Sequence, residues 1–252
     1  MNLHLAASIC VFRHEFASYF RTSIAYIYLC IFVFLAQLLT FTSGSFFEIG
    51  EASLAQSFFQ WHPLLYAVLI PTIGMRVWTQ EQQDGTIELL YAQPVAIYQL
   101  VVAKYLAAYC LVLLGLALTF PSVITVFYLG KPDPGEILSG YLGSALMAAA
   151  FLAVSCYCSA LLNNQVTAYI ISCSICAGTV LLGTTQIENE ILNTFPNSQN
   201  IVDMVSSLSA NKYFSGFRRG YIDLQSTAYF LLIILIFNIA CISCLNRKRN
   251  LS

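Results

Sequence analysis

Two pairs of cysteines have the C-x-x-C spacing of zinc sites: Cys173 with Cys176, and Cys241 with Cys244. On a helix such pairs share a face, and four thiolates can hold zinc. Both pairs, however, lie inside long apolar stretches, where forming thiolates costs desolvation free energy. Because cysteine is also a common small buried hydrophobic residue, we expect these side chains to pack between helices and predict no metal site.

Enzyme signatures are missing from the sequence. It contains no H-E-x-x-H, no G-x-S-x-G and no Gly-rich phosphate loop with a lysine, so we expect no ATP binding and no cofactor on this chain. Ion-coupled transporters commonly mark their path with intramembrane Asp, Glu, His or Arg, and residues 137–187 contain none. If the protein moves a substrate, the energy therefore comes from elsewhere.

The composition excludes a soluble domain. Of the 252 residues, 58% are hydrophobic and only 9% are charged, whereas soluble domains carry about 25% charged residues. A net charge of -1 also argues against a nucleic-acid partner, which a basic patch would bind. The remaining class is a polytopic membrane protein in contact with the lipid bilayer.

Charge-free runs set the number of membrane spans. A helix needs about 20 residues to cross about 30 Å of hydrocarbon, and lipid offers the backbone no hydrogen-bond partners. We therefore predict an all-α membrane protein with six transmembrane helices in a single domain, residues 1–252. The predicted spans are 22–41, 60–78, 105–129, 137–162, 166–186 and 224–245.

Small residues in the predicted fourth span indicate close helix packing. Gly140, Ser144 and Ala148 recur every four residues, and such a row lets helices approach closely in lipid. We expect this span to lie in the interior of the protein. Pro71 and Pro121 predict kinks in the second and third spans.

The distribution of Lys and Arg predicts the orientation. An even number of spans puts both termini on one side, which would hold seven of these residues against four on the other. Since short cytoplasmic loops are rich in Lys and Arg, we expect both termini to be cytoplasmic. Residues 1–21 carry Ile9, Phe12, Phe16 and Phe20 at helical spacing and predict an amphipathic interfacial helix; an ordinary soluble helix is the alternative.

The predicted cytoplasmic loop 79–104 has the pattern of a docking element. Its first half is acidic, with Glu81, Asp84 and Glu88. Asp84 is expected to cap a short helix by accepting a backbone N–H, and Pro94 to end that helix. An amphipathic hairpin below a membrane domain fits docking to a cytoplasmic partner, and a solvated loop helix fits the same pattern.

This loop resembles the ABC type-2 transporter permeases, whose pattern E-x-x-x-G-T-x-E-x-L-x-x-x-P is followed by V-x-x-K. Residues 130–170 and 212–230 resemble, more narrowly, the gliding-motility-type and nitrous-oxide-reductase-type permeases of that family. One departure is Asn163-Asn164, where relatives often have Thr-Arg or Thr-Lys. The matching loop positions are Glu81, Gly85, Thr86, Glu88, Leu90, Pro94, Val101 and Lys104.

The resemblance implies a permease subunit of an ATP-binding-cassette exporter in the bacterial inner membrane. Two copies, or one copy and a related permease, would pair above two separate ATPase subunits that carry ATP and Mg. The loop helix would be the coupling helix, and loop 188–223 would contain short helices that cap the path on the outside or pack against an outer partner. The implied coupling residues are Glu81, Asp84, Gly85, Thr86, Ile87, Glu88, Leu89, Leu90 and Pro94. The implied second cytoplasmic contact is Asn163, Asn164 and Gln165, and the implied outer gate is Tyr213, Phe214, Phe217 and Arg218.

The substrate class follows only loosely from the spans. Nearly charge-free spans fit an apolar or amphipathic cargo, such as a lipid-linked molecule, better than a highly charged one. A different class remains open, a membrane anchor of a motility or envelope-assembly complex that transports nothing. An intramembrane enzyme is disfavoured, because the spans contain no paired polar residues that suggest chemistry.

Overall fold

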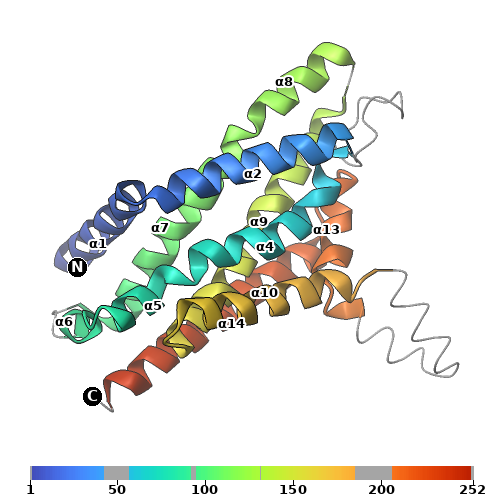
Figure 1. The fold of residues 1–252 in the computed structure, drawn as a ribbon. Coiled ribbons are helices and arrows are strands. Elements are labelled where there is room, and N and C mark those ends of the chain that lie inside the picture. The colour runs from blue at the N-terminus through green and yellow to red at the C-terminus, as the bar shows by residue number, and fades with distance from the viewer. Residues whose placement is uncertain (1, 43–56, 92–94, 131, 185–205, 251–252) are drawn as a thin grey trace, which may run out of the picture.

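The computed structural model describes residues 2–42, 57–91, 95–130, 132–184 and 206–250. These residues form helices and no strand, which confirms the all-α prediction (Figure 1). The elements are α1 (Asn2–Arg21), α2 (Ser23–Thr42), the 3-10 turn η1 (Phe59–Trp61), α4 (His62–Gly74), α5 (Arg76–Gln83), α6 (Ile87–Tyr91), α7 (Ile97–Leu118), α8 (Phe120–Leu129), α9 (Pro134–Leu161), α10 (Gln165–Leu181), α13 (Ala210–Arg218) and α14 (Leu224–Arg249).

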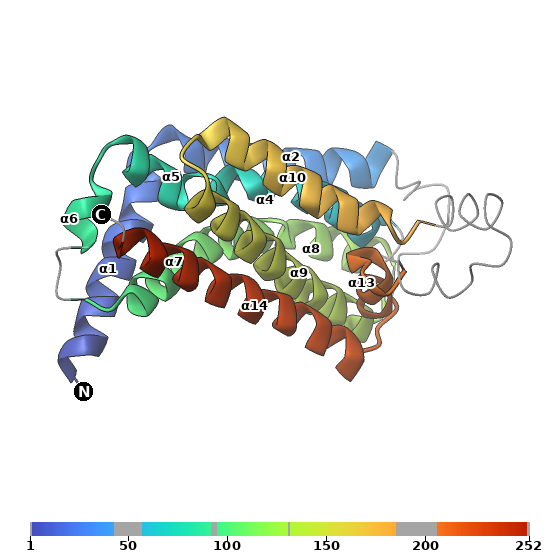
Figure 2. The ribbon, with the colours of Figure 1, turned by 90° about the horizontal axis from the view of Figure 1, so that it is seen from below.

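Helix α9 is the centre of the bundle. It contacts α4, α5, α7, α10, α13 and α14 (Figure 2). Small residues make this possible: a Cβ atom at Gly140 would lie 2.4 Å from the ring of Phe59, and one at Gly74 of α4 would lie 2.3 Å from Cβ of Ser155. The interior position predicted from the small-residue row is therefore confirmed.

Among the described residues, four helical segments are long and apolar enough to cross a membrane: α2, α7 with α8, α9 and α14. Helices α4 and α10 lie beside α9 but have only 13 and 17 residues. At 1.5 Å per residue they measure about 20 and 26 Å, less than the roughly 30 Å of the hydrocarbon core. The multi-pass character is thus clear, and the predicted number of six spans exceeds what helix length alone supports.

The predicted third span, 105–129, differs from the structure at both its start and its middle. Helix α7 begins at Ile97, two turns earlier, because the charge of Lys104 is neutralised inside the protein and does not end the apolar helix. The helix is interrupted at Thr119, whose hydroxyl donates to the carbonyl of Leu116. Pro121 in the first turn of α8 supplies no N–H, so the predicted distortion near this proline is a break between two helices.

The predicted second span, 60–78, is also two helices. Helix α4 ends at Gly74, Met75 interrupts the regular structure, and α5 begins at Arg76. Pro71 lies inside α4, where its missing N–H leaves a carbonyl one turn earlier without its intrahelical partner. The regular helix ends within a turn of this residue.

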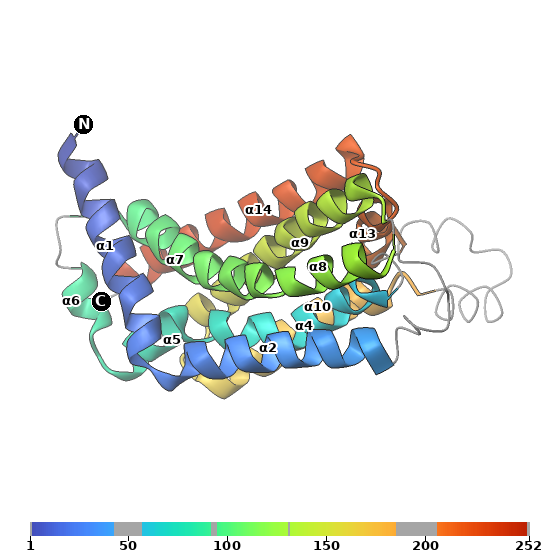
Figure 3. The same ribbon diagram turned by 90° about the horizontal axis from the view of Figure 1, so that it is seen from above.

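Both chain ends and α6 lie at the same end of the bundle, and α13 lies at the opposite end (Figure 1). Helix α1 lies across the end of the bundle, its axis at a steep angle to that of α2, and it contacts α7 (Figure 3). Within it, Phe12 stacks on Phe16 and Phe16 packs edge-on against Phe20. The predicted aromatic row of α1 is therefore one continuous strip.

Candidate coupling site

Lys104 is a buried cation on α7, with 2% of its surface exposed. Its ammonium group lies 2.8 Å from Oε1 of Glu15 on α1 and 2.5 Å from Oε1 of Glu81 on α5. The ring of Trp78 lies 5.4 Å from the same nitrogen, within the range of a cation–π contact. We call Glu15, Glu81 and Lys104 the ion cluster; it joins three helices through one cation.

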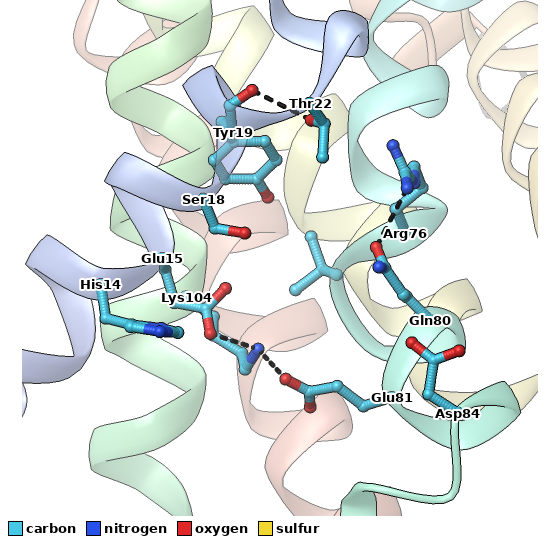
Figure 4. A pocket seen from close by; sticks show the side chains of 11 residues that line it. His14, Glu15, Ser18, Tyr19, Thr22, Arg76, Gln80, Glu81, Asp84 and Lys104 are labelled. Carbon is cyan, nitrogen blue, oxygen red and sulfur yellow. Dashed lines mark hydrogen bonds and ion pairs between the residues drawn. The ribbon is translucent and has the colours of Figure 1, made fainter.

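A polar cavity of about 160 Å³ lies beside the ion cluster, between α1, α5 and α7. Figure 4 shows the carboxylates of Glu15 and Glu81 directed toward Lys104 from opposite sides. Arg76, one turn before Gln80 on α5, donates to the side-chain carbonyl of that residue at 3.1 Å. The cavity lining comprises His14, Glu15, Ser18, Tyr19, Thr22, Arg76, Val77, Gln80, Glu81, Asp84 and Lys104.

Burial raises the pKa of the Glu81 carboxyl, and the neighbouring ammonium of Lys104 offsets only part of that rise. Its second oxygen, Oε2, is buried and has no hydrogen-bond partner among the described residues, and neither has Nε of Arg76. The site thus combines a strongly paired cation with polar atoms whose bonding is incomplete. Unpaired buried polar groups are costly, so these two atoms offset part of the stabilisation that the ion cluster supplies.

Helix α5 ends in a glycine-dependent turn. Gly85 has φ of 68°, the left-handed region that glycine adopts readily. The N–H of Thr86 donates to the carbonyl of Glu81 at 3.1 Å and the N–H of Asp84 to that of Gln80 at 2.9 Å. The bond between Thr86 and Glu81 is the 6→1 bond of the Schellman motif, and the bond between Asp84 and Gln80 is the ordinary i→i−4 bond of the last turn of α5. Asp84 is therefore the C-cap of α5. Its predicted role as the N-cap of the following helix is wrong, because Gly85 ends α5 and α6 begins only at Ile87.

The short helix α6 presents two different faces. Glu88 is exposed, as are Asp84, Gly85 and Thr86 before it. Ile87 and Leu90, two of the implied coupling residues, are half-buried and pack against the hydrophobic core of this chain. Pro94 and the side chain of Leu89 lie outside the part of the chain that the structure describes. We call residues 84–91 the coupling turn.

The second predicted contact lies at the same end of the bundle. Asn164 accepts the N–H of Val166 at 2.9 Å and so caps α10, which begins at Gln165. Lys248 of α14 donates to Oδ1 of Asn163 at 3.3 Å and to Oε1 of Gln82 on α5 at 3.2 Å. Lys248 therefore links the turn at Asn163 to α5, the helix that precedes the coupling turn.

The residues of the predicted outer gate form part of α13. Phe214 and Phe217 are buried, and Tyr213 stacks on Tyr229 of α14 with ring centroids 4.2 Å apart. The hydroxyl of Ser139 on α9 donates to the carbonyl of Phe217 at 2.8 Å. Helix α13 is thus fixed in the bundle, and Arg218 follows at its last turn. Positions 188–205 of the predicted outer loop lie outside the described residues.

The four C-x-x-C cysteines lie on two helices, α10 and α14. The thiol of Cys241 points to the carbonyl of Cys156 on α9 at 3.9 Å, and Cys244 to that of Ala160 at 3.7 Å. Within the described ranges, no three side chains of His, Cys, Asp or Glu gather as a metal site would require. The second pair therefore packs against α9.

The pattern of helices, with a polar site at the end that holds both termini, can be compared with known families. A model described as ABC-2 family transporter protein matches residues 9–248. The chain belongs to this family. No curated protein matches the sequence. This ABC-2 protein is accordingly a multi-pass transmembrane permease, of the kind that usually works with an ABC ATPase and is not itself the catalytic subunit.

Sequence reasoning missed how the ABC-2 chain uses Lys104, Glu15 and Lys248. Lys104 was used as a cytoplasmic positive charge and as the lysine of the V-x-x-K pattern, and no buried ion pair was predicted for it, although it stands alone among apolar residues in V-V-A-K-Y-L-A-A. An isolated charge in such a run signals a buried partner. Its identity had no local signal, because Glu15 lies 89 residues away along the chain.

Proposed function

We propose that this chain is the membrane subunit of an ABC exporter and that its coupling turn docks on a separate ATPase subunit. The observation that carries the proposal is the exposed position of Glu88 on the coupling turn. The preceding helix, α5, is fixed to α7 by the ion pair between Glu81 and the buried Lys104. An exposed acidic turn on a rigid support can pair with basic groups of a partner. ATP and Mg would be bound by that partner, with no cofactor on this chain.

The contacts of α5 support a transmission role. The ion cluster joins α5 to α1 and α7, and Gln82 joins it to α9 and α14 through the carbonyl of Ser159 and through Lys248. A force on the coupling turn would therefore reach the long helices through directional polar contacts rather than through loose loops. Asn163, Asn164 and Gln165 would form the second, smaller contact with the ATPase.

We further infer the arrangement in the membrane. Six passes, with α4 and α10 as short ones, place both termini and the coupling turn on one side, which the Lys and Arg distribution makes cytoplasmic. The bilayer would be a bacterial inner membrane, with α1 at its cytoplasmic surface and α13 covering the outer end. The working unit would contain two permeases, identical or related, and the cargo would be apolar or amphipathic.

The test is a charge reversal on the coupling turn, Glu88→Lys. Losing a charge-assisted contact costs about 1.5–3 kcal/mol, so we expect at least tenfold less ATPase subunit to co-purify at equal permease abundance. The matched control is Asp223→Lys, which makes the same change of charge at an exposed position before α14, at the opposite end. Leu90→Asp is unsuitable, because Leu90 packs on the core of the permease itself.

Equal co-purification for wild type and Glu88→Lys would reduce the coupling turn to a solvated loop and overturn the docking proposal. A second measurement separates an exporter from a membrane anchor. In an exporter, the hydrolysis rate of the attached ATPase rises with a translocated molecule, and Glu88→Lys abolishes that rise. An anchor would bind the ATPase without any such stimulation.

A further inference from the structure

A second cavity lies at the end of the bundle opposite the coupling turn. It has a volume of about 390 Å³ and lies between the start of α4, the end of α10 and α13. Polar lining groups come from Gln60, Trp61, Asn211 and Arg218, while Leu64 and Val180 contribute apolar surface. None of the described residues that line this cavity is acidic.

Two buried hydrogen-bond donors at this cavity have no acceptor. Nε of Arg218 and Nε1 of Trp61 are each inaccessible to solvent and make no hydrogen bond within the described residues. Both groups can only donate, so a lone pair from another molecule is what they lack. An unsatisfied buried donor is costly, and two of them in one lining need an explanation.

The electrostatics favour an anion at this position. Burial and the adjacent Arg219 hold the pKa of Arg218 below its usual value, yet a guanidinium remains charged in proteins. Arg218 and Arg219 thus concentrate positive charge at the end of α13. The planar fork of arginine matches a phosphate or carboxylate group better than a single-point acceptor.

The apolar part of the lining indicates what the anion is attached to. Val180 is 7% exposed, and Leu64 is 47% exposed, so the cavity reaches the outer surface of the bundle next to an apolar side chain. Trp61 is half-buried and lines this cavity, and a tryptophan between apolar and polar surroundings is typical of the membrane–water interface. The head group of an amphiphile would contact the polar lining of this cavity, and its apolar chain would contact Leu64.

We propose that this cavity binds the phosphate or carboxylate group of an anionic amphiphile, with Arg218 and Trp61 donating to its oxygens and Leu64 lying along its apolar part. The same oxyanion chemistry is available from free inorganic phosphate, so an experiment must separate these two sources. The proposal goes beyond the exporter function and does not depend on it, because binding here involves neither the ATPase nor the coupling turn.

The experiment measures lipid binding to the full-length chain, purified with any subunits that accompany it, in nanodiscs of phosphatidylcholine with increasing phosphatidylglycerol. Bound phosphatidylglycerol is counted by native mass spectrometry. We expect Arg218→Gln to weaken binding by roughly tenfold or more, since a charged hydrogen bond is removed. Arg219→Gln, which removes the same charge from an exposed neighbour outside the lining, should weaken it by less than about threefold.

Two further variants guard against misfolding as the cause. Trp61→Phe keeps an aromatic ring but removes the N–H, and it should weaken binding less than Arg218→Gln does. Arg218→Lys keeps the charge but loses the fork, and it should retain part of the affinity. A variant enters the comparison only if its thermal unfolding temperature equals that of the wild-type protein.

Inorganic phosphate is the probe for the second source. If phosphate fails to displace phosphatidylglycerol and the loss in Arg218→Gln is seen, the amphiphile is the ligand. If phosphate binds to wild type, displaces the lipid and fails to bind Arg218→Gln, the cavity is an oxyanion site for a soluble anion, and the role of Leu64 is overturned. Equal binding of both probes to wild type and Arg218→Gln overturns the site altogether.

Discussion

The ammonium group of Lys104 on α7 lies 2.8 Å from the carboxylate of Glu15 on α1, although 89 residues separate them in the chain. Since the same ammonium also binds Glu81, this lysine joins α1 to α5, the helix that precedes the coupling turn. Removing the lysine would leave two partly buried carboxylates facing one another. Lys104 is therefore the cation that joins α1, α5 and α7 at the end of the bundle that holds both termini.

Replacing Lys104 with methionine should therefore destabilise the permease strongly. Breaking a buried ion pair by removing one partner costs about 3–5 kcal/mol, so the thermal unfolding temperature of the purified protein should fall clearly below that of wild type. Arg219→Met, at an exposed position of the opposite end, is the control and should change it little. An unchanged unfolding temperature for Lys104→Met would contradict the structural importance of the ion cluster.

Adding Glu81→Gln to Lys104→Met should restore part of the lost stability. The second substitution removes one of the two carboxylates that the missing lysine leaves uncompensated, so the two effects are expected to be less than additive. The measurement is a double-mutant cycle on unfolding temperature with the two single variants and the double variant. Strict additivity would show that Glu81 and Lys104 act independently.

The stability of the protein should depend on the protonation of Glu81. Burial raises the pKa of this carboxyl above the ordinary value of 4.5, so the folded state holds the proton more tightly than the unfolded state. Its contribution is therefore greatest below pH 4.5 and is lost as pH rises through the raised pKa of the folded state. The unfolding temperature of wild type, measured against that of Glu81→Gln, should fall across this window; a constant difference would refute the assignment.

Substituting Gly85 by alanine should distort the coupling turn without creating a clash. The glycine has φ of 68°, and no atom lies within 4 Å of the position that a Cβ would take. The expected loss of stability is therefore about 1–2 kcal/mol, the cost of placing an L-residue in the left-handed conformation. Under the proposed function, ATPase co-purification should drop. Gly178→Ala is the matched control: it also meets no atom within 4 Å, has no left-handed φ and lies within helix α10. It should stabilise slightly. Similar losses for both variants would contradict a specific role of the turn.

The orientation can be tested by fusing topology reporters to truncated chains. Fusions after Gln83 and Arg249 should report a cytoplasmic position, and fusions after Lys131 and Asn200 an outside position. The expectation rests on an even number of passes and on the excess of Lys and Arg on the side of the termini. An outside signal at Gln83 would remove the coupling turn from the reach of any cytoplasmic ATPase.

Helices α2 and α14 could be predicted closely from sequence because charged residues lie next to at least one end of each. Span 224–245 corresponds to α14 (Leu224–Arg249) and span 22–41 to α2 (Ser23–Thr42). The prediction went wrong at Lys104, where a charge lies within a helix and is neutralised by residues distant in the chain. Rules based on local hydropathy treat every lysine as solvated, so the predicted helix starts after Lys104, two turns too late.

The turn at the candidate site could be predicted from sequence, whereas its internal bonding could not, and its docking role stays a prediction. The pattern around Gly85 located the turn, and the structure has it at the end that holds both termini. Which side chains of the turn are buried and which are exposed was not predictable. Only tertiary packing decides that Ile87 and Leu90 lie against this chain's own core while Glu88 is exposed. The cap assigned to Asp84 failed for a local reason, because the left-handed Gly85 ends one helix before the next begins.

The close approach of α4 and α9 at Gly74 and Ser155 has a consequence for how this sequence can vary during evolution. A Cβ at position 74 would lie 2.3 Å from Cβ of Ser155, so only one of these two positions can bear a side chain while the helix backbones stay in place. We expect related chains to have a side chain at only one of the two positions. Where the residue aligned with Gly74 is alanine or larger, the one aligned with Ser155 should be glycine. The pair would then change together through an intermediate in which both are glycine, a route that keeps the crossing intact at each step.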